Sequence, residues 1–237
     1  MNSATSPLTR GEFETRLLAA ADRYPFEETR LAKLLATGRC PPSMVRGYAE
    51  ALHKGSYEFN GLLAALVEAA PDREARGILL DNLLEEEGIV VQVGRGLVAY
   101  PQSRHVAWAE RFLRACGGAP PSDGHAAGDK GLPAGRVAEL LKDGRWLEAV
   151  SFLLIGMEMN FGKVCALLSE RFSGLGYAAR DLVFFEAHTH ADEKHAREAL
   201  DIVLDRAVDL AAQQACLDAA QAGARDWWLR HGGRAPS

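Results

Sequence analysis

Hydrophobic residues recur with helical period through most of the chain. The longest such stretch predicts one helix between residues 42 and 70. Pro41 and Pro42 stand at its beginning and Pro71 follows its end, so both ends of the predicted helix are marked. The segment 9–24 begins with Thr9 three residues before Glu12, which is the spacing of a capping box. Within the longest stretch, the apolar side chains that share one helix face are Val45, Tyr48, Leu52, Phe59, Leu62, Leu63 and Leu66.

Two segments interrupt the helical pattern. The run from Ile89 to Val93 has strand propensity, but Gly94 and Gly96 break it, so 89–103 is interpreted as an irregular excursion and a candidate lid. Residues 117–135 are rich in Gly and Pro and predict an exposed connection. Further helices are predicted at 72–88, 104–118, 136–143, 146–172, 177–206 and 208–230.

This pattern predicts an all-α protein. Neither an internal repeat nor regular strand alternation with turn signals is visible, so we expect one domain over residues 1–237 with about seven to eight helices. With 48% apolar and 25% charged residues, the composition is that of a soluble globular protein.

Charge and cysteine usage narrow the partners. The net charge is −5 without a basic block, which argues against nucleic acid. No run of 18 apolar residues and no signal-peptide pattern is present, so we expect no membrane partner. The 4 cysteines are scattered without a Cys-x-x-Cys pair, which is typical of reduced thiols in a cytoplasmic protein.

A short segment near residue 190 carries the strongest chemical signal. His188, Asp192 and His195 stand at i, i+4 and i+7, so they share one helix face. Apolar residues continue that face on both sides, and a buried carboxylate without a partner costs several kcal/mol. A metal ion would satisfy the carboxylate and both imidazoles. A solvated His and Asp cluster near a helix end remains the alternative.

Three further residues could join such a site. Glu158 stands alone in the apolar segment SFLLIGMEMNFGKVCALL and is expected to be buried, either as a ligand or bonded to Arg or Tyr. The acidic run at 83–88 places Glu86 at the edge of the inner face and Glu87 on it, although a solvated helix end has the same pattern. His105 has apolar neighbours, and a satisfied core or surface histidine is the plainer interpretation.

Helical bundles build di-iron sites from Glu and His on facing helices. The ferritin-like form uses two Glu-x-x-His motifs, and none of these histidines has a Glu three residues before it. A bundle with another ligand pattern is therefore required.

That pattern resembles the haem-oxygenase-like di-iron oxidases and oxygenases, which share a fold with pyrroloquinoline quinone synthase and thiaminase II. The similar segments are YPFEETRLAKLLATGRCPPSMVRGYAEAL, PDREARGILLDNLLEEEG, RHVAWAERFLRACG and the His-x-x-x-Asp-x-x-His spacing of the segment that begins at His188. The resemblance covers most of the chain. It implies a haem-oxygenase-like helical bundle.

The resemblance also implies a ligand set. One iron would be held by His105, Glu158 and His188, and the other by Glu86, Asp192 and His195. Glu85 is the competing register for Glu86, and Glu58 is a candidate extra ligand. His105 follows Glu86 by 19 residues, a longer gap than the family usually has.

The implied activity is that of a non-haem di-iron oxygenase with two Fe²⁺ ions, O₂ as co-substrate and an external electron donor. The expected substrate is a small amine or amino acid, with N-oxygenation favoured over oxidative C–C cleavage of an amino or fatty acid. His53, Tyr57 and His190 are candidates for positions beside the ligands or in the substrate pocket. For Tyr57, packing in the core is the favoured interpretation.

Two other functions stay open. One is a metal-free enzyme of the quinone-synthase or thiaminase II type. Thiaminase II relies on a cysteine nucleophile, and Cys165, the sole candidate, has apolar neighbours that indicate an inert thiol, so none is assigned. The quinone synthase has more His and Arg around its ligand than this chain offers. A non-catalytic helical protein would need an exposed apolar groove. Trp227 and Trp228 could form such a surface or a homodimer contact, although a terminal packing anchor is favoured.

Overall fold

The structure is a computed structural model that describes residues 6–92, 96–121 and 132–233. Contacts between residues divide the chain into two compact units, each built from segments that are distant in sequence. The first unit comprises residues 1–33, 131–164 and 189–237, and the second comprises 34–130 and 165–188. The single domain expected from the sequence stays a prediction.

The first unit is helical. Its helix α1 has the expected capping box, in which Thr9 and Glu12 each bond the other's backbone N–H. Helix α10 contacts α1, α6, α7 and a π-helical segment. The elements are α1 (Arg10–Ala21), a 3₁₀ turn (Phe26–Glu28), α6 (Leu132–Lys142), α7 (Trp146–Val150), the π-helical segment (Ser151–Glu158), α10 (Leu210–Arg230), the beginnings of α2 (Arg30–Ala36) and α8 (Phe161–Gly174), and α9 (Val183–Arg206) from Thr189 onward.

Two glycines let the π-helical segment and α10 touch backbone to backbone. A Cβ on Gly223 would collide with the carbonyl oxygen of Phe152, and one on Gly156 would collide with that of Ala220. Only glycine fits such a close approach. The crossing therefore fixes the π-helical segment two residues before Glu158.

The second unit is built around α3, which contacts α4 and α5. Its elements are α3 (Pro42–Ala69), α4 (Arg73–Glu86), β1 (Ile89–Gln92), β2 (Gly96–Ala99), α5 (His105–Ala115), 3₁₀ turns at Pro101–Ser103 and Ala179–Asp181, the end of α2, α8 from Cys165 onward and the first turns of α9. The predicted ends of α3 and α4 agree with these bounds to within two residues.

Aromatic side chains form the core of the second unit. Phe112 of α5 lies 4.9 Å from both Phe172 of α8 and Phe185 of α9, measured between ring centroids. Tyr48 of α3 lies 5.9 Å from Phe172. The three phenylalanines are fully buried. This cluster holds the helices that carry His105 and the first part of α9.

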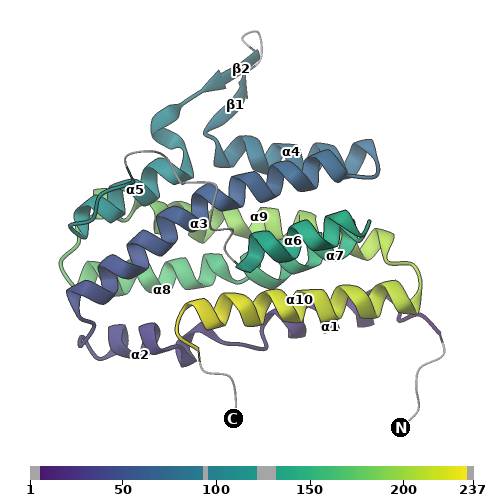
Figure 1. Cartoon of the computed structure of the whole chain (residues 1–237), viewed down its shortest axis with the longest axis horizontal. Coiled ribbons are helices and arrows are strands. Elements are labelled where there is room, and N and C mark those ends of the chain that lie inside the picture. The colour runs from purple at the N-terminus through teal and green to yellow at the C-terminus, as the bar shows by residue number, and fades with distance from the viewer. Residues whose placement is uncertain (1–5, 93–95, 122–131, 234–237) are drawn as a thin grey trace. The chain divides into compact units, whose positions relative to one another are not determined.

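The segment expected to be irregular forms a β-hairpin instead. Strands β1 and β2 pair antiparallel, with Ile89 opposite Ala99 and Gln92 opposite Gly96. Figure 1 shows the hairpin leaving the end of α4 and returning toward the start of α5. The expectation was wrong because Gly96, at φ +75°, begins the returning strand and does not end the strand structure.

The fold class is otherwise as expected. The described residues are mainly helical, with helices numbered α1 to α10 against the seven or eight expected. The excess arises partly because the predicted helix 146–172 consists of α7, the π-helical segment and α8. Helix α6 begins at Leu132, inside the connection that was expected to extend to residue 135.

One helical segment passes a length and composition test for a membrane span. It is Trp146–Gly174, with a mean hydropathy of 1.4 over its most apolar window, 61% of which is buried within the protein. The sequence pattern had indicated no such segment. A core helix of a water-soluble protein passes the same test.

Candidate metal centre

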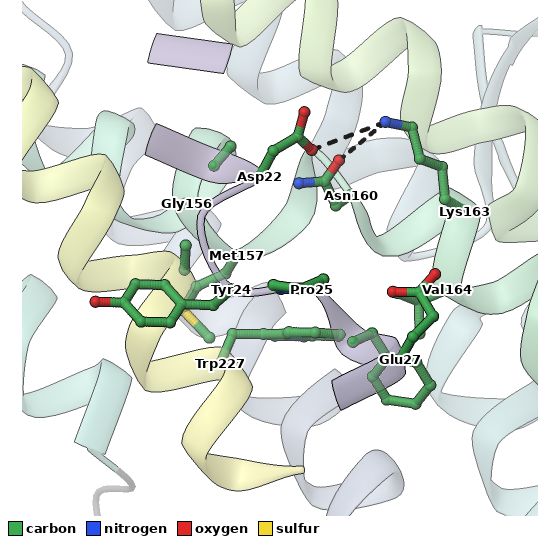
Figure 2. A pocket seen from close by; sticks show the side chains of 13 residues that line it. Asp22, Tyr24, Pro25, Glu27, Gly156, Met157, Asn160, Lys163, Val164 and Trp227 are labelled. Atoms are coloured by element: carbon green, nitrogen blue, oxygen red, sulfur yellow. Dashed lines mark hydrogen bonds and ion pairs between the residues drawn. The ribbon is translucent and has the colours of Figure 1, made fainter. Parts of the chain in front are cut away.

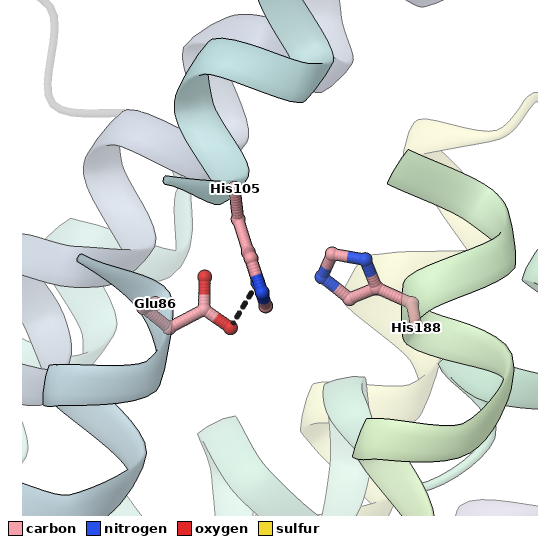
Figure 3. A group of neighbouring side chains, drawn as sticks. All are labelled: Glu86, His105 and His188. Carbon is pink, nitrogen blue, oxygen red and sulfur yellow. Dashed lines mark ion pairs between the residues drawn. The ribbon is translucent and has the colours of Figure 1, made fainter. Parts of the chain in front are cut away.

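Three side chains that can bind a metal converge in the second unit: Glu86, His105 and His188 (Figure 3). Each offers one ligand atom, and the three atoms lie within 4.8 Å of one another. The exposed fractions of the residues are 3%, 5% and 5% in the same order. One carboxylate and two imidazoles make a mixed oxygen and nitrogen set, which suits iron and manganese.

Glu86 is the last residue of α4 and points inward. Leu79, Asn82 and Glu86 are buried at i, i+3 and i+7, whereas Glu85 is less buried. Of the two registers that the acidic run left open, the structure therefore favours Glu86 for this cluster.

His105 begins α5 and faces the Glu86 carboxylate. Its Nδ1 lies 2.8 Å from Oε1 of Glu86. The Trp108 ring stacks on the imidazole with centroids 4.9 Å apart. An imidazole nitrogen and a carboxylate oxygen placed this close together can bind a shared cation, which would also offset the cost of a buried carboxylate.

His188 has a fixed tautomer. Its Nδ1 lies 2.7 Å from the backbone carbonyl oxygen of Phe184, and a carbonyl only accepts, so this nitrogen carries the proton. The lone pair is then on Nε2. The Phe184 ring stacks on the imidazole at 4.0 Å, and the centroid of the His105 ring lies 4.4 Å away. A backbone partner on one nitrogen is the usual arrangement for a metal-binding histidine.

The hairpin explains how His105 reaches Glu86 across 19 residues of sequence. The Tyr100 N–H donates to the Gly88 carbonyl oxygen at 2.8 Å, so the chain returns to the place where it left. Gly88 has φ +63°, and a Cβ there would lie 2.7 Å from the Tyr100 oxygen. The hairpin therefore does not separate Glu86 from His105 in space.

A second pair of candidate ligands lies in the first unit. Nδ1 of His195 lies 3.6 Å from Oε1 of Glu158, and both residues are buried. Glu158 ends the π-helical segment, and such segments are frequent at functional sites. The predicted burial of Glu158 is confirmed. The side chains of Asp192 and His190 lie outside the part of the chain that the structure describes.

The groups found within each unit differ from the ligand split that the resemblance implied, and that split stays a prediction. Glu86 accompanies His105 and His188, and Glu158 accompanies His195. The implied split had placed Glu158 with the first two histidines and Glu86 with His195. The difference arises because Glu86 and His105 meet at the hairpin base.

Three further candidates, His53, Tyr57 and Glu58, lie on α3. His53 of α3 is buried, and Glu58 has an ion pair with Lys54 at 3.7 Å. Tyr57 is 50% exposed, so the favoured expectation that it packs in the core was wrong. Trp228 is buried against Tyr24 at 5.6 Å, which confirms the packing anchor near the C-terminus.

A pocket of about 260 Å³ opens in the first unit, at the π-helical segment that ends in Glu158 (Figure 2). Nζ of Lys163 lies 3.9 Å from an Asp22 carboxylate oxygen and 3.3 Å from the Asn160 side-chain oxygen. Periodicity in the sequence gave no sign of this pocket because its residues come from four separate segments. The residues that give it its chemistry are Asp22, Tyr24, Phe26, Glu27, Asn160, Lys163 and Trp227.

Known proteins resemble the chain in fold and family. In fold, it is similar to the crystal structure of a TenA homolog from Pseudomonas syringae pv. tomato str. DC3000, with a TM-score of 0.66 and 13% identity. That match covers 94% of this chain and 89% of the other, and at this identity it shows the haem-oxygenase-like fold. No curated protein matches the sequence. Residues 46–228 match the model of a family described as iron-containing redox enzymes, so the chain belongs to the iron-containing redox enzyme family.

Proposed function

We propose that the chain is a non-haem di-iron oxygenase that uses O₂ to oxidise a small amine or amino acid. The observation that carries the proposal is the buried convergence of Glu86, His105 and His188. Glu158 and His195, with Asp192 one turn before His195 on α9, are the proposed ligands of the second ion. Family membership supports iron as the metal.

When bound, two ferrous ions supply electrons for the reduction of O₂. Neighbouring residues orient and cover the two histidines that would bind metal. Phe184 orients the His188 ring through its carbonyl oxygen and covers it with its own ring. Trp108 covers His105 in the same way. Burial by these rings keeps bulk water away from the ligands and strengthens their electrostatic interaction with a cation.

The favoured reaction is N-oxygenation. One oxygen atom of O₂ is added to the substrate nitrogen, and the other leaves as water, which takes up two protons and two electrons. A primary amine gives a hydroxylamine in this balance. The electrons come from an external donor, so a reductant is part of the proposal.

The pocket in the first unit supports a zwitterionic or amine substrate. Its carboxylates, Asp22 and Glu27, match an ammonium group, and Lys163 matches a carboxylate. The Trp227 ring forms part of the wall, and an aromatic face attracts ammonium. A lining of aromatic rings with few charged groups is typical of small-molecule sites.

A cysteine-based, metal-free enzyme has less support. Cys165 has an exposed fraction of 0%, and a nucleophilic thiol needs contact with its substrate. The Cys165 side chain, on α8, is therefore part of the packed core.

Anaerobic loading with ferrous iron, followed by removal of excess metal, tests the metal centre. We expect two irons per chain in the wild type and a lower iron content per chain in the His188→Ala variant. Replacement of the exposed Glu139 by Gln is the control, because its side chain is 69% exposed on α6. Absence of iron from the wild type would refute the proposal.

The reaction is tested with the loaded enzyme, a chemical reductant, ¹⁸O₂ and a panel of primary amines and α-amino acids. We expect products that are heavier by the labelled oxygen and that retain every carbon. Loss of a carbon fragment would replace N-oxygenation with oxidative cleavage. Quenching of tryptophan fluorescence by the same panel, reduced in Asp22→Asn, checks the assignment of the pocket.

A further inference from the structure

We infer that Arg104 is a positioning residue for the proposed metal centre. Through an ion pair with Glu87, it holds the ligands Glu86 and His105 together at the base of the hairpin. This inference rests on the proposed function, because it concerns the same metal site.

The two charged residues adjoin the two ligands in sequence. Glu87 follows Glu86, and Arg104 precedes His105. Nη2 of Arg104 lies 2.7 Å from Oε2 of Glu87, which is the short distance of a charge-assisted contact. The ion pair therefore links the residue that follows the end of α4 to the residue that precedes the start of α5.

A third helix holds the same carboxylate. Nδ2 of Asn60, on α3, donates to Oε1 of Glu87 at 2.5 Å, and Asn60 is buried. Oε1 of Glu87 thus accepts a hydrogen bond from Asn60 on α3, and Oε2 forms the ion pair with Arg104. Because α3 also contacts α4 and α5, the clasp made by Asn60, Glu87 and Arg104 joins all three elements.

The bond from Tyr100 N–H to the Gly88 oxygen closes the hairpin. The 3₁₀ turn Pro101–Ser103 and Arg104 then lead from Tyr100 to the start of α5. Arg104 is the residue at which a side chain can fix where α5 begins. The buried imidazole of His105 follows directly.

Magnitudes separate a positioning role from a purely structural one. The side chains of Arg104 and Glu87 are 42% and 29% exposed, and ion pairs of that exposure contribute about 0–1 kcal/mol to stability. Partners that orient metal ligands have a larger effect on the metal, typically about 10- to 100-fold in affinity. Removing the pair should therefore weaken metal binding while changing stability little.

The experiment is an anaerobic titration of the whole chain with Co²⁺, followed by visible absorption, together with urea unfolding of the metal-free protein. The test variants are Arg104→Gln, Arg104→Lys and Glu87→Gln. Arg114→Gln is the matched control, because Arg114 forms a 2.6 Å ion pair with Glu110 on the same helix, away from the ligands. We expect Arg104→Gln and Glu87→Gln to weaken Co²⁺ binding by about tenfold or more.

Arg104→Lys should recover most of the affinity, because it keeps a charged donor, and the control should match the wild type. The double variant Arg104→Gln with Glu87→Gln should bind no more weakly than either single variant, since both break the same contact. Wild-type affinity in both single variants would overturn the inference and leave the proposed function intact. So would weakening that only follows a loss of stability. Absence of Co²⁺ and Fe²⁺ binding in the wild type would instead overturn the proposed function.

Discussion

In the first unit, Nδ1 of His195 lies 3.6 Å from Oε1 of Glu158, with both side chains buried. The distance exceeds that of a hydrogen bond, so each atom can contact a common cation. Glu158 and His195 belong to segments 37 residues apart in sequence. The proposed second ion would bind at this pair.

Replacement of Glu158 by Gln should remove one of the two irons. The change keeps the size of the side chain and removes the negative charge that the ion requires. Iron per chain, measured after anaerobic loading and desalting, should fall to about half of the wild-type value, because Glu86, His105 and His188 remain. A Glu158→Gln variant that retains the wild-type iron content would contradict the assignment.

Replacement of Gly223 by Ala should destabilise the first unit. The new Cβ collides with the Phe152 carbonyl oxygen, and overpacking of this kind costs about 1–3 kcal/mol. Gly61→Ala is the control, because a Cβ on Gly61 of α3 would have no atom within 4 Å, and alanine there should stabilise by up to about 1 kcal/mol. Urea unfolding of the two variants should give free energies of unfolding that change in opposite directions.

Alanine substitutions at Gly88 and Gly96 should distinguish the cost of backbone strain from the cost of a steric clash. Both have positive φ, +63° and +75°, but a Cβ on Gly88 meets backbone at 2.7 Å, whereas nothing lies within 4 Å of one on Gly96. Ala at Gly96 should cost about 1 kcal/mol. Ala at Gly88 should cost more and should also weaken metal binding, because it displaces the hairpin base from Glu86. Equal losses in unfolding free energy and metal affinity for the two variants would count against this account.

His231 should make stability depend on pH. Burial lowers the pKa of His231 from its ordinary 6.5 to about 4, although its bond to the Trp227 carbonyl oxygen acts in the opposite direction. Between those values the unfolded chain binds a proton that the folded chain does not, so stability is fully present above pH 6.5 and falls as the pH decreases toward 4. Urea unfolding of wild type and His231→Gln across this range should show a shallower decline in the variant. Parallel declines would assign the effect to other groups.

Periodicity and capping signals were sufficient for most helices. The helix that became α3 could be read from one apolar face and its flanking prolines, and the capping box at Thr9 was confirmed. The π-helical segment could not be read in this way, because Ser151 through Gly156 are all buried and leave no polar face to set a period. It crosses α10 closely at Gly223, which follows Gly156 by 67 residues in the chain.

The candidate site was predictable in its residue types and less so in its grouping. Buried Glu158, His188 and His195 followed from polar residues on apolar helix faces. The meeting of Glu86 with His105 did not follow, because strand pairing between two four-residue segments brings them together. Periodicity placed Glu87 on the inner face of its helix, but nothing in the sequence indicated its pairing with Arg104, whose side chain is 42% exposed.

Because the base of the hairpin is closed, the distance between Glu86 and His105 in the fold does not depend on how many residues lie between them. Because Gly88 and Tyr100 are bonded at its two ends, the hairpin between them could lengthen or shorten in pairs of residues without moving Glu86 or His105. Relatives could therefore gain, lose or exchange this hairpin during evolution while the metal site stays the same. A fixed interval between the acidic and imidazole residues is consequently a poor criterion for recognising such enzymes, and the pairing of the loop's ends is a better one.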